Sequence, residues 1–418
     1  MIFSHLPQDI LIIIFQKLSL IDLVNFELVN LFYKELIRAT KWNRLVKLNE
    51  FNNVITSIIT HQFLKYDLSY FRLSNHDIIN FSHCIYLNFN SCDSIDLETS
   101  LQYLKNIKNI NLKNCNITNI GLKYLGNCEI INLKYSENIS YDGLKFLTNC
   151  TDIDLSVCIQ LIDNDLKCLG NCKKINLSDC CQITGECFKY FTSCTDIDLS
   201  HCHKISNTNL QYLEKCKKIN LSYCSSITNE GLKHLSSCTN ISLIESDITD
   251  NDLILLKNCN TIILQRSHQL SGTGFKYLEH CKKIDVRGCN GVIYKNFKYF
   301  NECKKIVLSY QTVKYPKMFK YFYNCRKISI YDGECMTDND LKYLAKCQHV
   351  KLSYCPQITD EGLKYLNSCS KILIRHCPKL TNQGLQHLKC LKKTTINDCC
   401  RVTNITNLTD IDPQINQR

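Results

Sequence analysis

The sequence contains little that would divide it into linked domains or anchor it in a membrane. Only five of its 418 residues are proline, and no Gly/Ser-rich linker or low-complexity tract interrupts it. The longest apolar run, ILIIIF at residues 10–15, is too short to span a bilayer, and it follows Asp9 with no basic segment before it. We therefore expect an intracellular protein of the cytoplasm or nucleus, with no membrane partner.

A strong charge of one sign is also missing. The net charge of +11 is moderate for this length, and charged residues make up 21% of the chain. A basic balance can indicate nucleic acid or an anionic membrane surface, but a solvated face rich in lysine is the simpler interpretation and the one we favour.

Cysteine, in contrast, is abundant and regularly spaced. The chain has 29 cysteines, and one series recurs every 22 residues, as from Cys216 to Cys238. The series consists of Cys128, Cys150, Cys172, Cys194, Cys216 and Cys238 and, after one step of 21 residues, Cys259, Cys281, Cys303, Cys325, Cys347 and Cys369. A fixed period in this range is the signature of a repeat architecture.

Each repeat predicts a short strand followed by a short helix. Numbered from its first cysteine, the repeat reads C-x-x-I-x-L-x-x-C-x-x-I-T-x-x-x-L-x-x-L. Ile219 and Leu221 alternate with polar residues as in a strand. Thr228 then predicts a helix N-cap, and Leu232 and Leu235 form the apolar stripe of a helix of about two turns. Such a helix is unstable alone, so the repeats must stack as a solenoid.

The first nine positions resemble the leucine-rich repeat, in the cysteine-containing form found in many F-box proteins. The resemblance implies an α/β solenoid, a leucine-rich-repeat horseshoe with short parallel strands on the concave face and short helices outside. Following the period outwards gives about sixteen repeats over residues 63–408, the first of them degenerate as a capping repeat should be. A polar tail remains at residues 409–418.

Most cysteines fall into two columns of the repeat. The first position holds Cys84 and the twelve cysteines of the periodic series, and the ninth position holds Cys92, Cys115, Cys158, Cys180, Cys202, Cys224, Cys289, Cys355, Cys377 and Cys399. A free cysteine behaves as a small buried hydrophobe with a weak S–H donor. A disulfide framework needs an oxidising compartment, and zinc commonly needs CxxC pairs, which the chain lacks. We therefore predict packing thiols and no metal or other cofactor.

Three apolar helices are predicted before the repeats, within residues 1–48, and a connector follows at residues 49–62. Pro7 suits the first helical position, and Ser19 and Asp22 have the spacing of a helix cap. One apolar stripe of the first helix is formed by Ile10, Leu11, Ile14, Phe15 and Leu18. Three helices in so short a segment form a thin core, so part of this surface needs a partner or the adjoining repeats.

This segment resembles an F-box. The matching residues are Leu6-Pro7, Asp9-Ile10-Leu11, Ile14-Phe15, Leu18, Asp22-Leu23, Val29 and the single tryptophan, Trp42. Asn30 stands where many F-boxes have cysteine. The family implies docking onto the Skp adaptor of a cullin–RING ubiquitin ligase, with contacts from Leu6, Pro7, Ile10, Ile14, Leu18 and Val29. A helical cap for the solenoid is the alternative. The richness in Ile, Asn and Lys suggests an AT-rich genome, such as that of an amoeba or a giant virus that infects one.

Two motifs resemble chemical sites only superficially. His201 and His203 flank Cys202, but Cys202 belongs to the ninth-position column, so its neighbours should diverge from it. Gly272 and Gly274 lack the third glycine and the βαβ context of a dinucleotide loop. No nucleophile–base set or phosphate loop is present, so we do not expect an enzyme.

The target surface is predicted on the concave face, which positions 3, 5 and 7 of each repeat should line. In the middle and later repeats, position 5 becomes apolar, position 7 loses its serines and position 3 becomes a column of lysines. The predicted residues are Ile244, Ile263, Gln265, Lys283, Arg287, Lys305, Val307, Lys327 and Tyr331. Mixed apolar, aromatic and cationic surface is typical of protein interfaces. Ordinary drift on a solvated face is the alternative.

The combined interpretation is a substrate-recognition subunit of a Skp–cullin–F-box ubiquitin ligase, acting in the cytoplasm or nucleus, or in the host cytoplasm if the gene is viral. The F-box would bind the Skp adaptor, and through it the cullin–RING ligase, while the repeats hold a protein target. Two alternatives remain open: a decoy that sequesters adaptor or target, and a basic solenoid that binds nucleic acid. The lysines lack regularly interleaved stacking aromatics, which disfavours the second.

Overall fold

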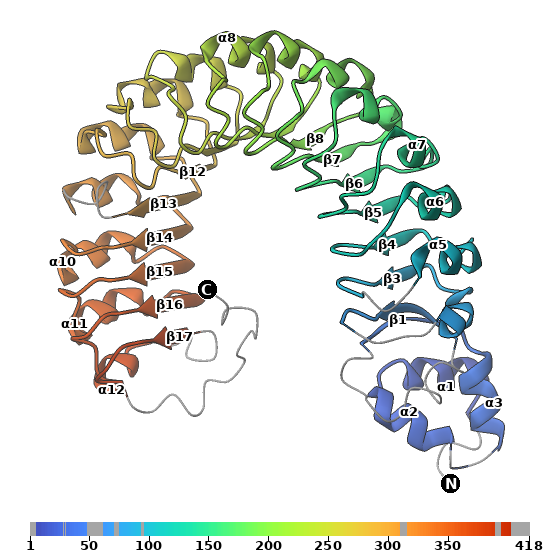
Figure 1. Ribbon diagram of the computed structural model, residues 1–418. Coiled ribbons are helices and arrows are strands. Elements are labelled where there is room, and N and C mark those ends of the chain that lie inside the picture. The colour runs from blue at the N-terminus through green and yellow to red at the C-terminus, as the bar shows by residue number, and fades with distance from the viewer. Residues whose placement is uncertain are drawn as a thin grey trace. The chain divides into compact units, whose positions relative to one another are not determined.

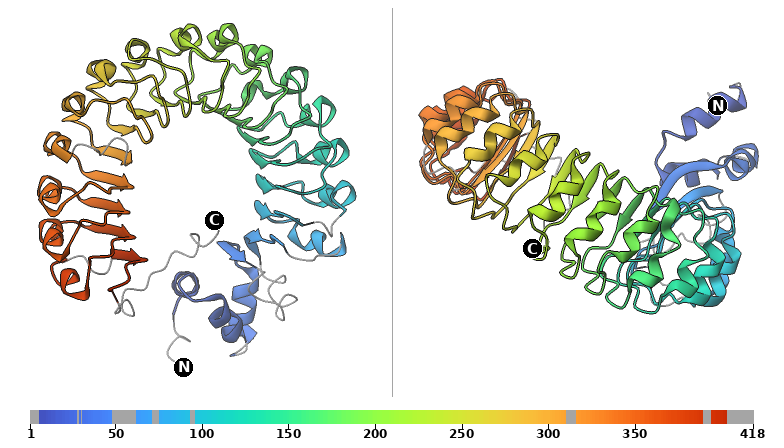
Figure 2. Two further views of the ribbon diagram at one scale, coloured as in Figure 1. Left: turned by 60° about the vertical axis from the view of Figure 1, so that its left-hand side comes forward. Right: turned by 90° about the horizontal axis from the view of Figure 1, so that it is seen from above.

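Short parallel strands and short helices alternate along most of the chain (Figures 1 and 2). The computed structural model describes residues 6–27, 29, 31–47, 62–70, 75–92, 96–309, 316–388 and 394–402. The predicted connector, residues 49–62, lies outside this part except for residue 62, and the polar tail lies entirely outside it. The chain divides into two compact units, Met1–Asp198 and Leu199–Arg418, which are described separately.

The first unit begins with three helices. They are α1 (Gln8–Phe15), α2 (Leu20–Glu27) and α3 (Leu31–Ala39). Pro7 is the N-cap residue of α1 rather than its first helical residue, and its carbonyl oxygen accepts hydrogen bonds from the amides of Ile10 and Leu11 (3.1 Å each). Ser19 and Asp22 cap α2 reciprocally: the Asp22 amide donates to Ser19 Oγ (3.1 Å) and the Ser19 amide to Asp22 Oδ2 (3.3 Å). The predicted cap is therefore confirmed.

An aromatic cluster holds the three helices together. The ring centroid of Phe15 lies 5.4 Å from that of Phe26 and 6.0 Å from that of Tyr33, and Phe26 and Tyr33 are 6.0 Å apart. Leu11 on α1 and Ile37 on α3 are also buried, with 1% and 0% of their surface exposed. One aromatic ring from each helix thus fixes the packing of a segment that has little other core.

A strand that the sequence analysis missed joins these helices to the repeats. Strand β1 (Trp42–Lys47) pairs in parallel with β2 (Phe63–Asp67), with Trp42 opposite Phe63. Trp42 is 2% exposed, and its ring centroid lies 6.2 Å from that of Phe63. Only Trp42 and Val46 are buried along β1, so the strand has no clear alternating pattern in the sequence. The sheet therefore begins inside the segment predicted as F-box alone.

The rest of the first unit is a stack of repeats in which each strand is parallel to the next. Its strands after β2 are β3 (Tyr86–Asn88), β4 (Asn109–Asn111), β5 (Ile130–Asn132), β6 (Asp152–Asp154), β7 (Lys174–Asn176) and β8 (Asp196–Asp198). The helical segments, with 3₁₀ helices labelled η, are η2 (Asn75–Phe81), α5 (Leu97–Ser100), η3 (Leu101–Tyr103), α6 (Asn119–Leu122), η4 (Lys123–Leu125), α7 (Tyr141–Leu144), η5 (Asp163–Leu166), η6 (Leu169–Asn171) and η7 (Glu186–Tyr190).

The second unit continues the same pattern. Its strands are β9 (Lys218–Asn220), β10 (Asn240–Ser242), β11 (Thr261–Ile263), β12 (Lys283–Asp285), β13 (Lys305–Ser309), β14 (Lys327–Tyr331), β15 (His349–Ser353), β16 (Lys371–Arg375) and β17 (Thr394–Asn397), again parallel in chain order. Its helical segments are η8 (Asn207–Leu213), α8 (Asn229–Leu232), η9 (Lys233–Leu235), η10 (Asp252–Leu256), η11 (Thr273–Leu278), η12 (Tyr294–Phe300), η13 (Pro316–Tyr321), α10 (Asp338–Leu341), η14 (Lys342–Leu344), α11 (Asp360–Leu363), η15 (Lys364–Leu366) and α12 (Asn382–Leu385).

In both units the strands form one side of the stack and the helices the other (Figure 1), which confirms the predicted leucine-rich-repeat solenoid. The helical segments have about the predicted length of two turns but are not wholly α-helical. Thr228 does cap α8, since its Oγ1 accepts a hydrogen bond from the Glu230 amide (3.3 Å), and α8 is a single turn that continues as the 3₁₀ helix η9. A 3₁₀ helix rises about 2.0 Å per residue against 1.5 Å in an α-helix, so it crosses the repeat with fewer residues.

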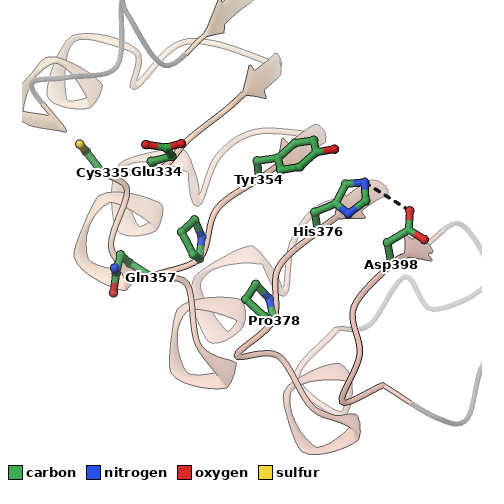
Figure 3. Close-up of a pocket in the computed structure, with 8 residues that line it drawn as sticks. Glu334, Cys335, Tyr354, Gln357, His376, Pro378 and Asp398 are labelled. Carbon is green, nitrogen blue, oxygen red and sulfur yellow. Dashed lines mark ion pairs between the residues drawn. The ribbon is translucent and has the colours of Figure 1, made fainter.

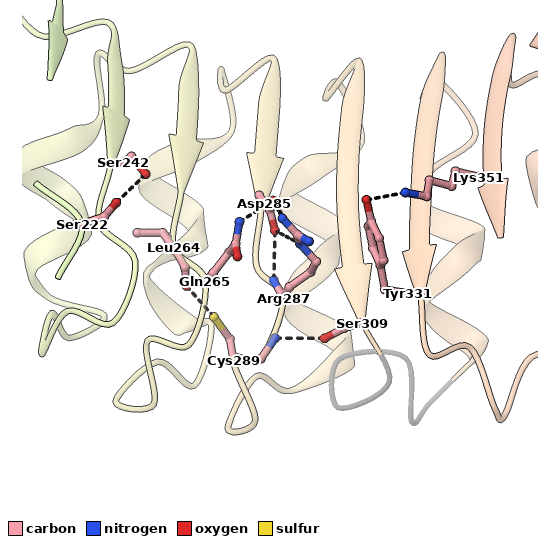
Figure 4. A network of polar contacts seen from close by, with 11 residues as sticks. Ser222, Ser242, Leu264, Gln265, Asp285, Arg287, Cys289, Ser309, Tyr331 and Lys351 are labelled. Carbon is pink, nitrogen blue, oxygen red and sulfur yellow. Dashed lines mark hydrogen bonds and ion pairs between the residues drawn. The ribbon is translucent and has the colours of Figure 1, made fainter. Parts of the chain in front are cut away.

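The cysteine columns are buried packing groups. Each of the 28 described cysteines is a free thiol, and all 23 column cysteines are buried; Cys390 lies outside the described residues. The ninth-position thiols of Cys158 and Cys289 donate to the backbone carbonyls of Leu133 (3.3 Å) and Leu264 (2.8 Å) in the preceding repeat (Figure 4). Burial raises the pKa of both thiols to about 12, which keeps them protonated as donors.

Candidate functional site

Large apolar side chains are exposed on the N-terminal helices. This helical apolar surface consists of Ile10 (43% exposed), Ile13 (54%), Val29 (63%), Leu31 (68%) and Phe32 (46%). Single exposed hydrophobic residues are normal on a soluble protein, but five of them within one small helical segment make this segment a candidate interaction site.

The six predicted adaptor-binding residues differ in exposure. Ile10, Val29 and Pro7 are exposed, whereas Leu6, Ile14 and Leu18 are half-buried. That these residues contact an adaptor remains a prediction.

The single apolar stripe predicted for α1 is divided in the structure. Leu11 and Phe15, four residues apart, face the aromatic cluster, while Ile10 and Ile13 face outwards. Ile13, Leu31 and Phe32 are also exposed, although the sequence did not lead us to predict them. One signal was available, because the run ILIIIF makes α1 apolar on all sides, and such a helix needs cover on both faces.

The polar residues at position 5 of the early repeats have a structural role. The side-chain oxygens of Asn132, Asp154, Asn176 and Asn220 each accept a hydrogen bond from the amide two residues later, at 2.9, 3.0, 3.0 and 3.1 Å. This Asx motif ends the strand at position 5 and turns the chain.

Later strands are longer where this motif is absent. Position 5 holds Val307, Ser329, Lys351 and Leu373 in β13–β16, and these strands have five residues each, against three in β3–β12. The extra pairing places Tyr331, at position 7, opposite Ser309 in the sheet. Strands β10 and β11 also lack the motif and stay short, so its loss permits the extension without being sufficient for it.

A buried carboxylate organises part of the predicted target surface (Figure 4). Asp285 is 5% exposed and accepts hydrogen bonds from Arg287 Nε (3.0 Å, to Oδ1), Arg287 Nη2 (2.8 Å, to Oδ2) and Gln265 Nε2 (3.0 Å, to Oδ2). The fork of the guanidinium is thus fully engaged by one carboxylate. Two predicted residues, Arg287 and Gln265, are therefore brought together by a third that the sequence analysis did not select.

Tyr331 lies between two cations. The guanidinium carbon of Arg287 is 4.7 Å from the centroid of its ring, and Nζ of Lys351 is 4.3 Å from it. Lys351 Nζ also donates a 2.8 Å hydrogen bond to the Tyr331 hydroxyl (Figure 4). Lys351 was not predicted, although a lysine at position 5, where the early repeats have Asn or Asp, was a signal for it.

The other predicted target residues are divided in exposure. Ile244, Ile263, Lys283 and Lys305 are half-buried and Lys327 is exposed. The expected exposure of Val307 was wrong. Its side chain is only 7% exposed, because it lies in register between Asp285 and Ser329 on the lengthened sheet. Target binding by these residues remains a prediction.

A shallow groove of about 590 Å³ lies beside the last strands of the second unit (Figure 3). Tyr354 and His376 stack at 4.2 Å between ring centroids, and His376 Nε2 lies 3.4 Å from Asp398 Oδ2. All three occupy position 8 of their repeats, where the backbone is left-handed (φ 54°, 51° and 56°). Three of the residues that line the groove thus occupy one recurring position of the repeat.

The two superficial motifs have structural explanations. His201 stacks on Tyr223 with centroids 4.3 Å apart, while Cys202 is buried. The Gly274 amide donates to Asp250 Oδ1 (2.8 Å), so the donor that a phosphate would need already binds a carboxylate. Within the described residues, no three His, Cys, Asp or Glu side chains are grouped to hold a metal ion.

None of the helices in the described part of the chain combines the length and apolar character that a bilayer crossing needs.

Comparison with known families finds two matches. The F-box domain matches residues 3–45, and the leucine-rich repeat matches residues 346–366. Comparison with curated protein sequences finds no match.

Two solved structures are similar in fold. They are an internalin (inlF) of Listeria monocytogenes (16% identity, 77% of this chain and 82% of that chain covered, TM-score 0.36) and TLR13 in a TLR13–ssRNA13 complex (14%, 85% and 69%, TM-score 0.49). At these values neither structure bears on function.

Proposed function

We propose that this protein, which joins an F-box domain to a leucine-rich-repeat solenoid, is the substrate-recognition subunit of a Skp–cullin–F-box ubiquitin ligase. The observation that carries the proposal is the helical apolar surface. Its five exposed side chains lie on and between α1 and α3, within the residues that match the F-box. Docking on a Skp adaptor would bury them. Full burial of one exposed large apolar side chain stabilises by about 1.5–3 kcal/mol, and each of these partly exposed side chains would contribute a fraction of that.

The repeats supply the second half of the proposal. The strand side of the second unit carries the Asp285–Arg287–Tyr331 network and the predicted lysines, and their mixed chemistry supports binding of a protein target. In this role the protein brings the target close to the ligase and contributes no catalytic residue of its own. The 28 free thiols support a reducing, intracellular environment for this function.

Co-purification with a Skp adaptor and cullin tests the first half. The double variant Ile10→Asp/Ile13→Asp should lose the adaptor, because binding would bury two unpaired carboxylates. The matched control is Ile120→Asp, which alters an isoleucine of similar exposure (51%) on the repeat helix α6 and should keep the adaptor. Retention of adaptor and cullin by the double variant would refute the proposal.

The second half is tested by ubiquitylation of the captured target. With the wild-type chain present, ubiquitin transfer to the co-purified target should increase, and the double variant should remove this increase. Adaptor binding without any transfer would instead identify the protein as a decoy that occupies the adaptor.

A further inference from the structure

Three lysines stand side by side on consecutive strands of the second unit. The register of the sheet pairs Lys283 with Lys305 and Lys305 with Lys327, all at position 3 of their repeats. Neighbouring strands are about 4.8 Å apart, so the three Cα atoms span roughly 10 Å. We call these residues the lysine column.

Further cationic residues flank the lysine column, both along each strand and across the sheet. The residue before each lysine is also a cation, in the order Lys282, Lys304 and Arg326. Along the same register, the next two strands place His349 beside Lys327 and Lys371 beside His349.

The same position on three consecutive strands of the first unit carries charges of opposite sign. There the register places Lys174 between Asp152 and Asp196, so the sign alternates from strand to strand. Lys174 Nζ lies 3.3 Å from Asp152 Oδ2. Like charges on adjacent strands are therefore not a requirement of the repeat, and opposite charges fit the same position.

The charge of the lysine column is not compensated. In the part of the chain that the structure describes, no ion pair joins Lys283, Lys305 or Lys327 to a carboxylate. Asp285 attracts Lys305 but is already held by Arg287. Burial, followed by repulsion from Lys283 and Lys327, lowers the pKa of the Lys305 amine. The isolated chain thus holds a repulsive arrangement that an anion would relieve.

We propose that the lysine column binds an acidic segment of the target, rich in Asp and Glu, that lies across strands β12–β16. This inference rests on the proposed function and names the chemistry that the target surface selects. From Lys283 to Lys371 the register covers roughly 19 Å, which an extended segment of about six residues would span.

The shape of the surface favours several carboxylates over one phosphate group. Charges spread in a line across the sheet match a run of acidic side chains, whereas a single phosphate needs donors that converge on one point. The guanidinium of Arg287, which could otherwise bind a phosphate through two parallel hydrogen bonds, has its fork engaged by Asp285.

Nucleic acid is disfavoured by the neighbouring aromatic residue. Single strands bind through bases stacked on aromatic rings beside the cations. The ring of Tyr331 already has Arg287 and Lys351 against it, at 4.7 and 4.3 Å from its centroid, so a stacking base would have to compete with these cations.

The test is fluorescence anisotropy of a dye-labelled, glutamate-rich peptide of about eight residues, titrated with the full chain. The variant Lys283→Gln/Lys305→Gln/Lys327→Gln should bind the peptide about tenfold more weakly or worse. Its matched control, Lys276→Gln/Lys298→Gln/Lys320→Gln, removes the same charge from exposed lysines on η11, η12 and η13 and should change binding by no more than about twofold. Thermal unfolding of both variants should show that they are folded.

Three outcomes would overturn the inference. An equal loss of binding in the two variants would show diffuse charge attraction only. Tighter, column-dependent binding of a peptide whose single charge is one phosphoserine would identify a phosphate site. Tighter, column-dependent binding of a single-stranded RNA would identify a nucleic-acid surface. Both variants should still co-purify with the Skp adaptor; failure of the wild-type chain to do so would refute the proposed function while leaving the peptide result intact.

Discussion

The indole Nε1 of Trp42 donates a 2.9 Å hydrogen bond to the backbone carbonyl of Ile37. This bond connects strand β1, the first strand of the sheet, to helix α3, the last helix of the F-box. Arg44 makes a second connection, since its Nη1 donates to the Leu18 carbonyl between α1 and α2 (2.5 Å). The three F-box helices are therefore packed against the first strand of the sheet through these two hydrogen bonds, and the F-box and the first repeats belong to one compact unit.

Replacing Trp42 with Phe should destabilise this junction. The Ile37 carbonyl would lose its indole partner in a buried position, at a cost of about 1–3 kcal/mol in the free energy of unfolding. Chemical denaturation followed by circular dichroism measures the change. A stability equal to that of the wild type would mean that water replaces the bond and that the junction is looser than described.

The two faces of α1 should respond differently to truncation. Leu11→Ala removes a side chain that is 1% exposed and should cost about 2–5 kcal/mol, whereas Ile13→Ala, 54% exposed, should stay within about 0.5 kcal/mol. In adaptor co-purification the order should be reversed, and Ile13→Ala should lose more adaptor than Leu11→Ala. Similar losses of stability in the two variants would place Ile13 in the core.

The two cysteine columns should tolerate serine to different degrees. Ser246 and Ser267 already occupy the ninth position of two repeats, and Ser246 Oγ donates to the Leu243 carbonyl (2.9 Å). Cys289→Ser should therefore change stability by less than about 1 kcal/mol, since a hydroxyl there can donate to the Leu264 carbonyl that now accepts from the thiol, or to a carbonyl of its own repeat as Ser246 does.

The matched variant in the same repeat is Cys281→Ser. The first position holds only cysteine or a larger apolar residue in the predicted repeats, so a hydroxyl there should cost about 1–3 kcal/mol. Equal effects of the two substitutions, measured by denaturation, would contradict the distinction between the columns.

Alkaline pH should unfold the protein steeply. Burial raises the pKa of Cys84, Cys128 and Cys180 from 9.0 to about 12, so above pH 9 the unfolded chain releases protons that the native chain retains. In this range the unfolded state binds fewer protons than the native state. The free energy of unfolding therefore falls by up to about 1.4 kcal/mol per pH unit for each such thiol as the pH rises from about 9 to about 12. Below pH 9 this contribution is fully present.

Thiolate absorbance and circular dichroism, recorded together across this range, provide the measurement. The thiolate signal of those buried cysteines whose pKa is raised, such as Cys84, Cys128 and Cys180, should appear only as the secondary structure is lost. Extensive thiolate formation in a chain that remains folded would show that the columns are accessible to solvent.

Neutralising the centre of the lysine column should stabilise the chain. Lys305→Gln removes a charge flanked by Lys283 and Lys327 and should raise the free energy of unfolding by up to about 1 kcal/mol at neutral pH. Lys298→Gln, on η12 of the preceding repeat, is the control and should have no measurable effect. A loss of stability in Lys305→Gln would mean that the column is compensated in solution.

The sequence by itself determined the repeat and its cross-section. A 22-residue period with apolar residues at positions 4 and 6 leaves one way to bury them, a stack of parallel strands, and the cysteines had to pack inside that stack. Ile219, Leu221, Leu232 and Leu235 are all buried as predicted. The F-box was equally evident, because its motif is local in the chain.

Only the tertiary structure decided which side chains meet across repeats. Trp42 belongs to a strand because Phe63 lies opposite it, and Val307 is buried because Asp285 and Ser329 flank it. Ile13 is exposed because the aromatic cluster covers the other face of α1. These outcomes depend on register and on packing between residues distant in sequence. The residue pattern within one repeat, which is all that a periodic sequence displays, fixes the direction of a side chain but not its neighbours.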